Sequence, residues 1–137
     1  MATDRQKLIV RLDSVFSQFI RLRDAGKDGG IRCVSCGQRF EPDYIDCGHY
    51  IPREHMATRF SEMNCHAQCH FCNRQKRGNL EAYRDALVTM YGEDAVEALE
   101  QRKFQAVKMG KSELQDKLDF YRDEVKLLRL QKPNVKI

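Results

Sequence analysis

Two Cys-x-x-Cys pairs constrain this 137-residue chain more than any other feature. The pairs are Cys33-Val34-Ser35-Cys36 and Cys69-His70-Phe71-Cys72. Two residues between cysteines let both thiolates reach one ion, and two such pairs complete a tetrahedral zinc site. A site with four cysteine ligands leaves no open position for substrate or water, so its zinc supplies folding energy rather than chemistry. The spacing therefore predicts a structural zinc, with these four cysteines as its ligands.

The rest of the composition narrows the class of protein. Six cysteines without an apolar signal segment fit a reducing, cytoplasmic environment, in which cysteines bind metals rather than form disulfides. We expect Cys47 and Cys65, which fall outside the two pairs, to be small buried residues. The net charge of +4 is compatible with a polyanionic partner without establishing one. Charged residues make up 32% of the chain, and no apolar run approaches the roughly 20 residues of a spanning helix, which argues against a membrane protein.

The length suits one domain over residues 1–137, and the pattern of elements is α+β and mostly helical. Apolar residues at helical spacing predict an N-terminal helix over 4–25. The period is lost at 31–51, where Ile31–Val34 and Tyr44–Cys47 are expected to pair as strands, and 52–68 shows no regular pattern. Further helices are predicted over 73–92 and 94–108 and in a last segment ending near residue 131, so that 81–131 forms a helical C-terminal extension.

The last helix carries the most regular apolar pattern. It is expected to open with a capping box, Ser112-Glu113-Leu114-Gln115, in which Ser and Gln satisfy each other's backbone donors. Its apolar residues then recur at spacings of four and three, at Leu114, Leu118, Tyr121, Val125 and Leu128. This seam fits a coiled coil with a second copy, giving a homodimer through the C-terminal helix, and equally fits packing on the first helix of the same chain.

The 32 residues between the two cysteine pairs exceed what a simple zinc ribbon needs, which indicates a functional insertion. Two motifs stand there: Gly48-His49-Tyr50-Ile51-Pro52, and the Asn-x-His-x-Gln-Cys-x-x-Cys-Asn run from Asn64 to Asn73. In combination with the first cysteine pair they resemble the HNH nucleases and the phage NinG (Rap) recombination proteins, and the Cys-x-x-Cys-Asn ending resembles phage recombination endonuclease VII. The resemblance covers residues 31–80. It implies a small zinc-stapled ββα-metal core there, flanked by the N-terminal helix and the C-terminal helices.

The resemblance also implies an activity and its residues. It implies a metal-dependent DNA endonuclease in which His49 is the general base that activates water. Asn73 would ligate Mg²⁺ or Mn²⁺ through its amide oxygen, and Asn64 would orient the loop that carries the base. Gly48 stands where many HNH proteins have a further metal ligand, which leaves Asp46 or His66 as the second ligand. In an ideal strand Asp46 and His49 point to opposite faces, so a shared site would need a bend, for which Gly48 is suited.

Five basic residues surround these motifs: Arg53, Arg59, Arg74, Lys76 and Arg77. They fit DNA phosphate contacts and also fit a solvated charged face, and nothing in the pattern reads base edges. The resemblance implies branched recombination intermediates, such as Holliday junctions or flaps, as substrates in a bacterial or phage-infected cell. Three alternatives remain open: a non-catalytic zinc-stabilised nucleic-acid-binding module, an interaction protein, and an HNH nuclease acting on ordinary duplex DNA.

Overall fold

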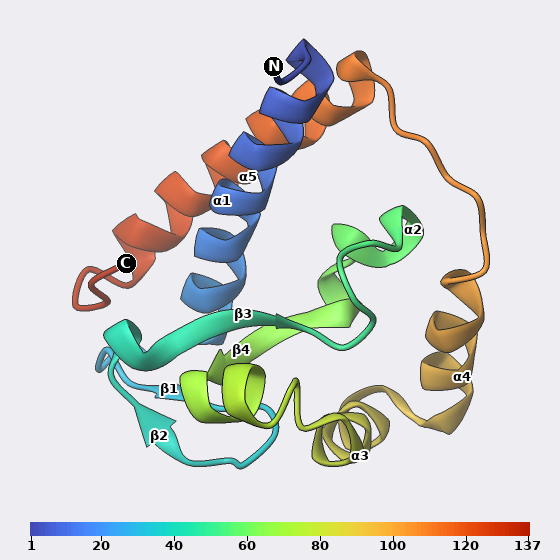
Figure 1. The fold of residues 1–137 in the computed structure, drawn as a ribbon. Helices are drawn as coiled ribbons and strands as arrows, with labels where there is room; N and C mark the ends of the chain where they lie inside the picture. Colours follow the sequence, from blue (N-terminus) through green and yellow to red (C-terminus); the bar gives the residue numbers. More distant parts are fainter.

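A computed structural model describes all of residues 1–137 as a mixed α+β structure with helices and two small sheets (Figure 1). Two long helices, α1 (Asp4–Asp24) and α5 (Lys111–Gln131), lie side by side and cover one side of the β region. Two shorter helices, α3 (Leu80–Tyr91) and α4 (Glu93–Arg102), lie beyond it. The α+β class predicted from the sequence is confirmed. None of the helices is both long and apolar enough to cross a membrane.

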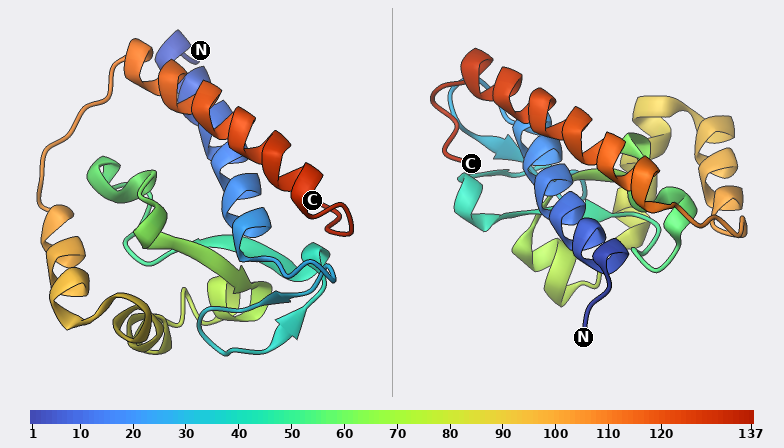
Figure 2. Two further views of the ribbon diagram at one scale, coloured as in Figure 1. Left: turned by 180° about the vertical axis from the view of Figure 1, so that it is seen from behind. Right: turned by 90° about the horizontal axis from the view of Figure 1, so that it is seen from above.

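Helices α1 and α5 run in the same direction (Figure 2). Near their starts, Arg5 Nε donates to the Met109 carbonyl at 2.7 Å. Near their ends, Lys132 Nζ donates to three carbonyls that finish α1, those of Leu22, Arg23 and Ala25, at 2.7 to 3.0 Å. A cation at this position satisfies carbonyls that have no partner within the helix and favours the negative end of the helix dipole.

The apolar seam of α5 is used within the chain. Leu114, Leu118, Tyr121 and Val125 are buried in one cluster with the α1 residues Leu12, Phe16, Phe19, Ile20 and Leu22. The edge-to-face pair of Phe16 and Tyr121, with ring centroids 4.9 Å apart, joins the two helices directly. Of the two arrangements that the sequence left open, the structure therefore shows packing on the first helix.

The capping box predicted at Ser112 does not form. Helix α5 begins at Lys111, so that Ser112 already lies in its first turn, and its N-cap is Gly110, which has no side-chain cap. A capping box forms instead at the start of α1, where the Thr3 side chain accepts from Gln6 N–H and the Thr3 N–H donates to the Gln6 side chain.

The strand pairing predicted from the sequence is wrong. Strand β1 (Ile31–Arg32) pairs with β2 (Arg39–Phe40), while β3 (Ile45–His49) pairs with β4 (Cys65–Cys69), both antiparallel. The first cysteine pair lies in the loop of the short β1–β2 hairpin, where the Cys33 N–H donates to the Gln38 carbonyl and the Val34 N–H donates to the Ala67 carbonyl of β4. All five residues of β4 are buried, including the polar His66 and Gln68, so neither face of the strand is exposed to solvent.

The segment 52–68 also contains the short helix α2 (Met56–Arg59) and the 3₁₀ turn Glu62–Asn64, which the sequence pattern did not indicate. The helix predicted over 73–92 is in fact two pieces. A π-helical turn, Phe71–Gln75, is separated from α3 by Arg77, Gly78 and Asn79, all at positive φ. Helix α4 ends at Arg102 rather than near 108, because Phe104 and Val107 are exposed and bury nothing that would hold a further turn.

Candidate functional site

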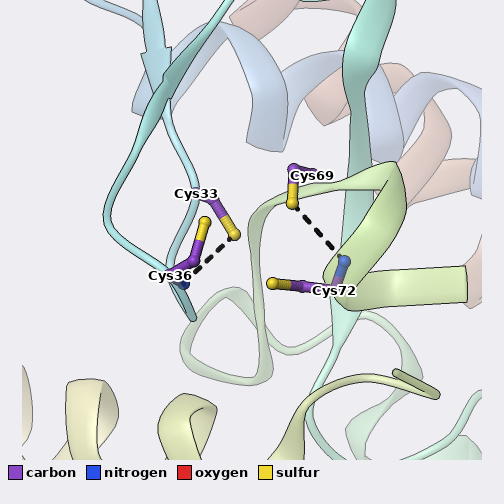
Figure 3. A group of neighbouring side chains, drawn as sticks. All are labelled: Cys33, Cys36, Cys69 and Cys72. Atoms are coloured by element: carbon purple, nitrogen blue, oxygen red, sulfur yellow. Dashed lines mark hydrogen bonds between the residues drawn. The ribbon is translucent and has the colours of Figure 1, made fainter. Parts of the chain in front are cut away.

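The four predicted zinc cysteines come together at one place (Figure 3). Their sulfur atoms all lie within 4.8 Å of one another. Cys33 and Cys36 follow β1, Cys69 ends β4, and Cys72 lies in the π-helical turn, so the cluster joins both sheets to the turn. Cys36 is exposed, whereas the other three are buried.

Backbone N–H groups donate to two of the four sulfur atoms, although burial raises the pKa of Cys69 to about 12. The Cys36 N–H donates to Cys33 Sγ at 3.5 Å, and the Cys72 N–H donates to Cys69 Sγ at 3.4 Å. Burial alone would raise the pKa of Cys33, but backbone N–H groups outweigh it and bring that pKa below its usual value. Gly37, at φ +73°, allows the tight turn after the first pair. Four converging thiol groups with such donors fit a structural metal such as zinc, which these cysteines could hold.

A polar cleft of about 430 Å³ lies between α1, β3 and the π-helical turn. Five residues predicted from the sequence border it: Asp46, His49, Arg53, Asn73 and Arg74. The α1 residues Asp13, Phe16 and Ser17 and the strand residue Cys47 complete the lining. Catalytic candidates that stand far apart in the sequence are therefore collected around one opening.

His49 is held by the backbone of Arg59. Its Nε2 lies 3.0 Å from the Arg59 carbonyl oxygen, which can only accept, so Nε2 carries the proton and Nδ1 has a free lone pair. Burial lowers the pKa of His49, although the hydrogen bond to Arg59 opposes this shift. The lowered pKa favours the neutral ring, in which one nitrogen is able to accept a proton.

Asp46 is a carboxylate held in its ionised form. Arg74 donates to it twice, at 2.9 and 3.0 Å, and Asn73 Nδ2 donates at 3.0 Å. The His70 ring lies 3.3 Å from the same carboxylate. Burial alone would raise the pKa of Asp46, but the bonds from Arg74 and Asn73 bring it below its usual value. Because Asn73 uses its amide nitrogen on Asp46, its Oδ1 remains available beside a carboxylate oxygen.

Gly48 does not introduce a bulge between Asp46 and His49, since the β3–β4 register is unbroken over all five residues. Strand β3 has a partner on one edge only, and residues of both its faces border the cleft along the free edge. Gly48 instead makes room for Gln68, because a Cβ at residue 48 would lie 2.2 Å from Gln68 Oε1. The Gln68 amide nitrogen donates to Gly78 and Ser35, which ties β4 to both neighbouring loops.

Asn64 is fully buried and joins the ends of the loop that follows His49. Its Oδ1 accepts from the Ile51 N–H at 2.8 Å, and its Nδ2 donates to the Ile51 and Thr58 carbonyls at 3.0 and 3.2 Å. These bonds fix the segment that carries the Arg59 carbonyl, and through it the His49 ring.

Asp13 is a cleft residue that the sequence analysis missed. It accepts from Arg59 Nε at 3.0 Å and from Arg59 Nη2 at 2.5 Å, and both side chains are less than one-fifth exposed. The sequence gives little reason to single out Asp13 as a site residue. It only shows that Asp13 lies three residues before Phe16, on the buried side of α1. Arg59 is thus committed to a largely buried ion pair, whereas Arg53 and Arg74, which pair with Asp13 and Asp46, border the cleft with side chains about 60% exposed.

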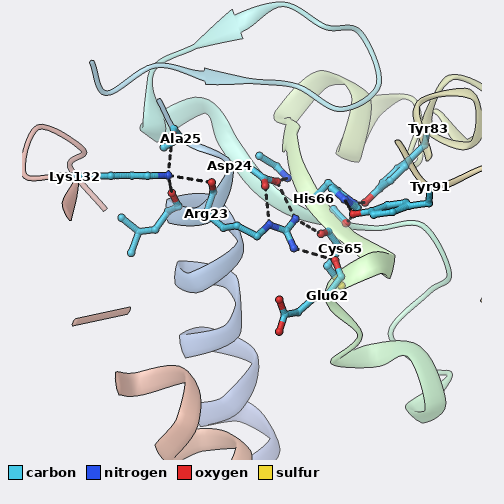
Figure 4. A network of polar contacts seen from close by, with 12 residues as sticks. Arg23, Asp24, Ala25, Glu62, Cys65, His66, Tyr83, Tyr91 and Lys132 are labelled. Carbon is cyan, nitrogen blue, oxygen red and sulfur yellow. Dashed lines mark hydrogen bonds and ion pairs between the residues drawn. The ribbon is translucent and has the colours of Figure 1, made fainter. Parts of the chain in front are cut away.

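Three of the residues predicted from the sequence lie away from the cleft. His66 points to the other face of β4, where its Nδ1 lies 3.3 Å from the Tyr83 hydroxyl and its Nε2 lies 2.9 Å from the Tyr91 hydroxyl (Figure 4). Lys76 lies over the Phe71 ring, with its nitrogen 5.5 Å from the ring centroid, and Arg77 lies in the exposed turn before α3. None of the three lines the cleft.

These features define a small α+β protein in which four cysteines that could hold a metal ion lie beside a polar cleft. The chain belongs to the bacteriophage lambda NinG protein family, whose family model matches residues 2–131. The predicted resemblance to NinG proteins is confirmed, while that to HNH nucleases and endonuclease VII stays a prediction.

Curated relatives named Protein ninG show the extent of the similarity. The protein of Escherichia phage lambda is 36% identical over 97 residues, covering 70% of this chain and 45% of the relative. Those of Escherichia phage 933W and Salmonella phage P22 are 37% and 36% identical over the same length, covering 70% of this chain and 46% and 45% of the relatives. The chain thus spans somewhat less than half the length of these relatives. No solved structure matches it.

Proposed function

We propose that the polar cleft is the active site of a metal-dependent DNA endonuclease of the HNH type. One observation carries the proposal: a carbonyl-held His49 and the Asp46–Asn73 pair of oxygen-bearing side chains border the same cleft. A base with a free nitrogen and a pair of hard oxygen ligands are the two components that metal-assisted hydrolysis requires.

In this proposal His49 Nδ1 accepts the proton of the water that attacks the phosphorus. The Asp46 carboxylate and Asn73 Oδ1 would hold Mg²⁺ or Mn²⁺, which when bound neutralises charge on the phosphate and stabilises the leaving oxygen. Arg74 and His70 keep Asp46 ionised and fix its direction. Asn64 and Asp13 act indirectly. Each is hydrogen-bonded to the segment whose Arg59 carbonyl orients the His49 ring.

The proposed substrate is DNA, and branched recombination intermediates are its preferred form. Arg53 and Arg74 at the cleft rim are suited to phosphates on either side of the scissile bond. The preference for branches rests on the resemblance of the motifs to phage recombination nucleases. Without side chains arranged to recognise base edges, selectivity would come from the shape of the DNA.

A homodimer, which cutting two strands of a junction would need, cannot use the apolar seam of α5 because that seam is buried on α1. On the same helix, the outer face with the exposed Phe120, Leu127 and Leu130 is the apolar surface left for contact with a second copy. Light scattering on the purified chain, with and without junction DNA, measures whether the chain is a monomer or a dimer.

The nuclease proposal is tested with the purified zinc-loaded chain and three end-labelled substrates of equal length: linear duplex, flap and four-way junction. We expect cleavage that requires added Mg²⁺ or Mn²⁺ and is about tenfold or more faster on branched DNA. Equal rates on all three would favour an ordinary duplex nuclease. DNA binding without cleavage under any condition would overturn the proposal in favour of a non-catalytic zinc module.

A further inference from the structure

We propose that Cys47, His49 and Cys65 form a second metal site, selective for thiophilic ions such as Zn²⁺, and that an ion bound there withholds His49 from catalysis. The binding part stands on the geometry of the three side chains. The inhibitory part rests on the proposed function.

The backbone places the three ligands in a fixed array. In the β3–β4 register His49 lies directly opposite Cys65, and Cys47, two residues before His49, projects from the same face of β3. The two sulfur atoms and a ring nitrogen of His49 all lie within 4.8 Å of one another. Paired strands rather than a flexible loop therefore hold the three groups together.

Polar contacts distinguish this cluster from ordinary apolar packing. His49 Nε2 and Cys65 Sγ both face the Arg59 carbonyl oxygen, at 3.0 and 3.8 Å. The cluster shares no ligand with the four-cysteine site, so both can be filled in one chain.

The donor set selects the metal. Two thiolates and an imidazole suit Zn²⁺, whereas Mg²⁺ prefers oxygen ligands and would not compete. Three protein ligands leave a fourth tetrahedral position open. Cys47 and His49 line the cleft, so this position is open to water or to a phosphate oxygen there. Binding releases the two thiol protons to solvent, with no change in oxidation state.

The consequence for His49 follows from its lone pair. A ring nitrogen that donates its lone pair to a metal cannot accept a proton from water, and an ion in this site would also alter the ring's contact with Arg59. The same histidine would therefore serve either as a base or as a zinc ligand. Thiophilic ions would act as inhibitors by a route separate from the cation held by Asp46 and Asn73.

The experiment is a Co²⁺ titration of the full chain under reducing conditions, followed by thiolate-to-metal charge-transfer absorption. We expect two ions per wild-type chain, and one in Cys47→Ala and in Cys65→Ala, whose four-cysteine sites are intact. Cys47 is only half-buried, so Cys47→Ala provides a variant less prone to unfolding than Cys65→Ala, and circular dichroism verifies both. One ion in the wild type, or two in both variants, overturns the proposal.

A second measurement tests the inhibition. Within each protein, the cleavage rate with Mg²⁺ alone is compared with the rate after Zn²⁺ is added to the zinc-loaded chain. We expect a fall of about tenfold or more in the wild type and less than about twofold in Cys47→Ala, because the variant lacks one of three ligands. Equal inhibition of both overturns the inhibitory part. If the wild type cleaves no DNA at all, the nuclease proposal fails, whereas the Co²⁺ stoichiometry still decides whether the site exists.

Discussion

The Asp13 carboxylate accepts two hydrogen bonds from the Arg59 guanidinium, at 3.0 and 2.5 Å. The Arg59 carbonyl in turn accepts the hydrogen bond from His49 Nε2 at 3.0 Å. A residue on the N-terminal helix thus fixes the segment that orients the proposed base, although Asp13 does not contact His49 through any hydrogen bond of its own.

We predict that Asp13→Asn lowers kcat for DNA cleavage by about tenfold or more and changes KM little, because the His49 ring loses its fixed orientation. Asp13→Glu, which keeps the charge, should restore part of the rate. Steady-state kinetics on junction DNA measure both. Asp116→Asn, on the exposed face of α5, is the matched control. If Asp13→Asn cleaves as fast as this control, Asp13 is not a positioning residue.

The four-cysteine cluster should be required for folding. Cys33→Ser removes one thiolate and is expected to abolish tight metal binding and the cooperative unfolding transition, since metal binding and folding are coupled. Metal analysis and circular dichroism on the purified protein measure the two effects. Ser35→Ala, between the two cysteines of the same pair, should keep its metal. A metal-free Cys33→Ser variant that unfolds like the wild type would contradict a structural role for the cluster.

Gly48 should tolerate no side chain. Gly48→Ala places a Cβ 2.2 Å from Gln68 Oε1, and we expect a loss of roughly 1–3 kcal/mol in the free energy of unfolding. Gly110→Ala is the control, because no atom lies within 4 Å of a Cβ there and φ is −79°, so its effect should stay within about 1 kcal/mol. Urea unfolding of both variants measures the two changes in the free energy of unfolding. Equal effects would show that Gln68 does not require a glycine at residue 48.

His66 should make stability depend on pH. Tyr83 donates to the Gly48 carbonyl at 2.7 Å, so its hydroxyl accepts from His66 Nδ1–H, and Nε2 accepts from Tyr91. Burial, helped by Arg23, lowers the pKa of His66 to about 4. The unfolded chain, with a histidine pKa near 6.5, then binds the proton more readily than the folded chain.

The resulting stability is fully present above about pH 6.5 and is lost as the pH falls toward 4, with a total change of up to roughly 3 kcal/mol. His66→Gln removes this titration, so its unfolding free energy should vary less than that of the wild type between about pH 7 and pH 5. Parallel pH profiles for the two proteins would show that His66 is not the group responsible.

Local patterns in the sequence predicted much of the site. The cysteine spacing identified the four residues that converge in space, and the motifs around His49 and Asn73 identified two side chains that border one cleft. Each Cys-x-x-Cys pair and each motif spans only a few residues, and over such a short stretch chain geometry limits the outcome. Cys65 is buried as expected, while Cys47 is half-buried at the cleft.

Long-range relationships could not be predicted in this way. Asp13 reaches the cleft only because α1 packs across β3, and the partner of β3 is a short strand whose polar residues are buried together with its apolar ones. His66 shares a motif with residues near the cleft, but it lies opposite Gly48 in the β3–β4 register and its ring contacts Tyr83 and Tyr91 instead. These outcomes depend on tertiary packing, which cannot be predicted from local patterns of residues.

The central claim is that His49 is the base of a metal-dependent nuclease. The most direct measurement is the single-turnover rate of junction cleavage in Mg²⁺ for His49→Ala and for His55→Ala, at equal zinc content. His55 lies on the following loop outside the cleft and is the matched histidine control. We expect a loss of about 10²-fold or more for His49→Ala and a rate close to that of the wild type for His55→Ala. Equal rates for the two variants, or no cleavage by the wild type, would contradict the account.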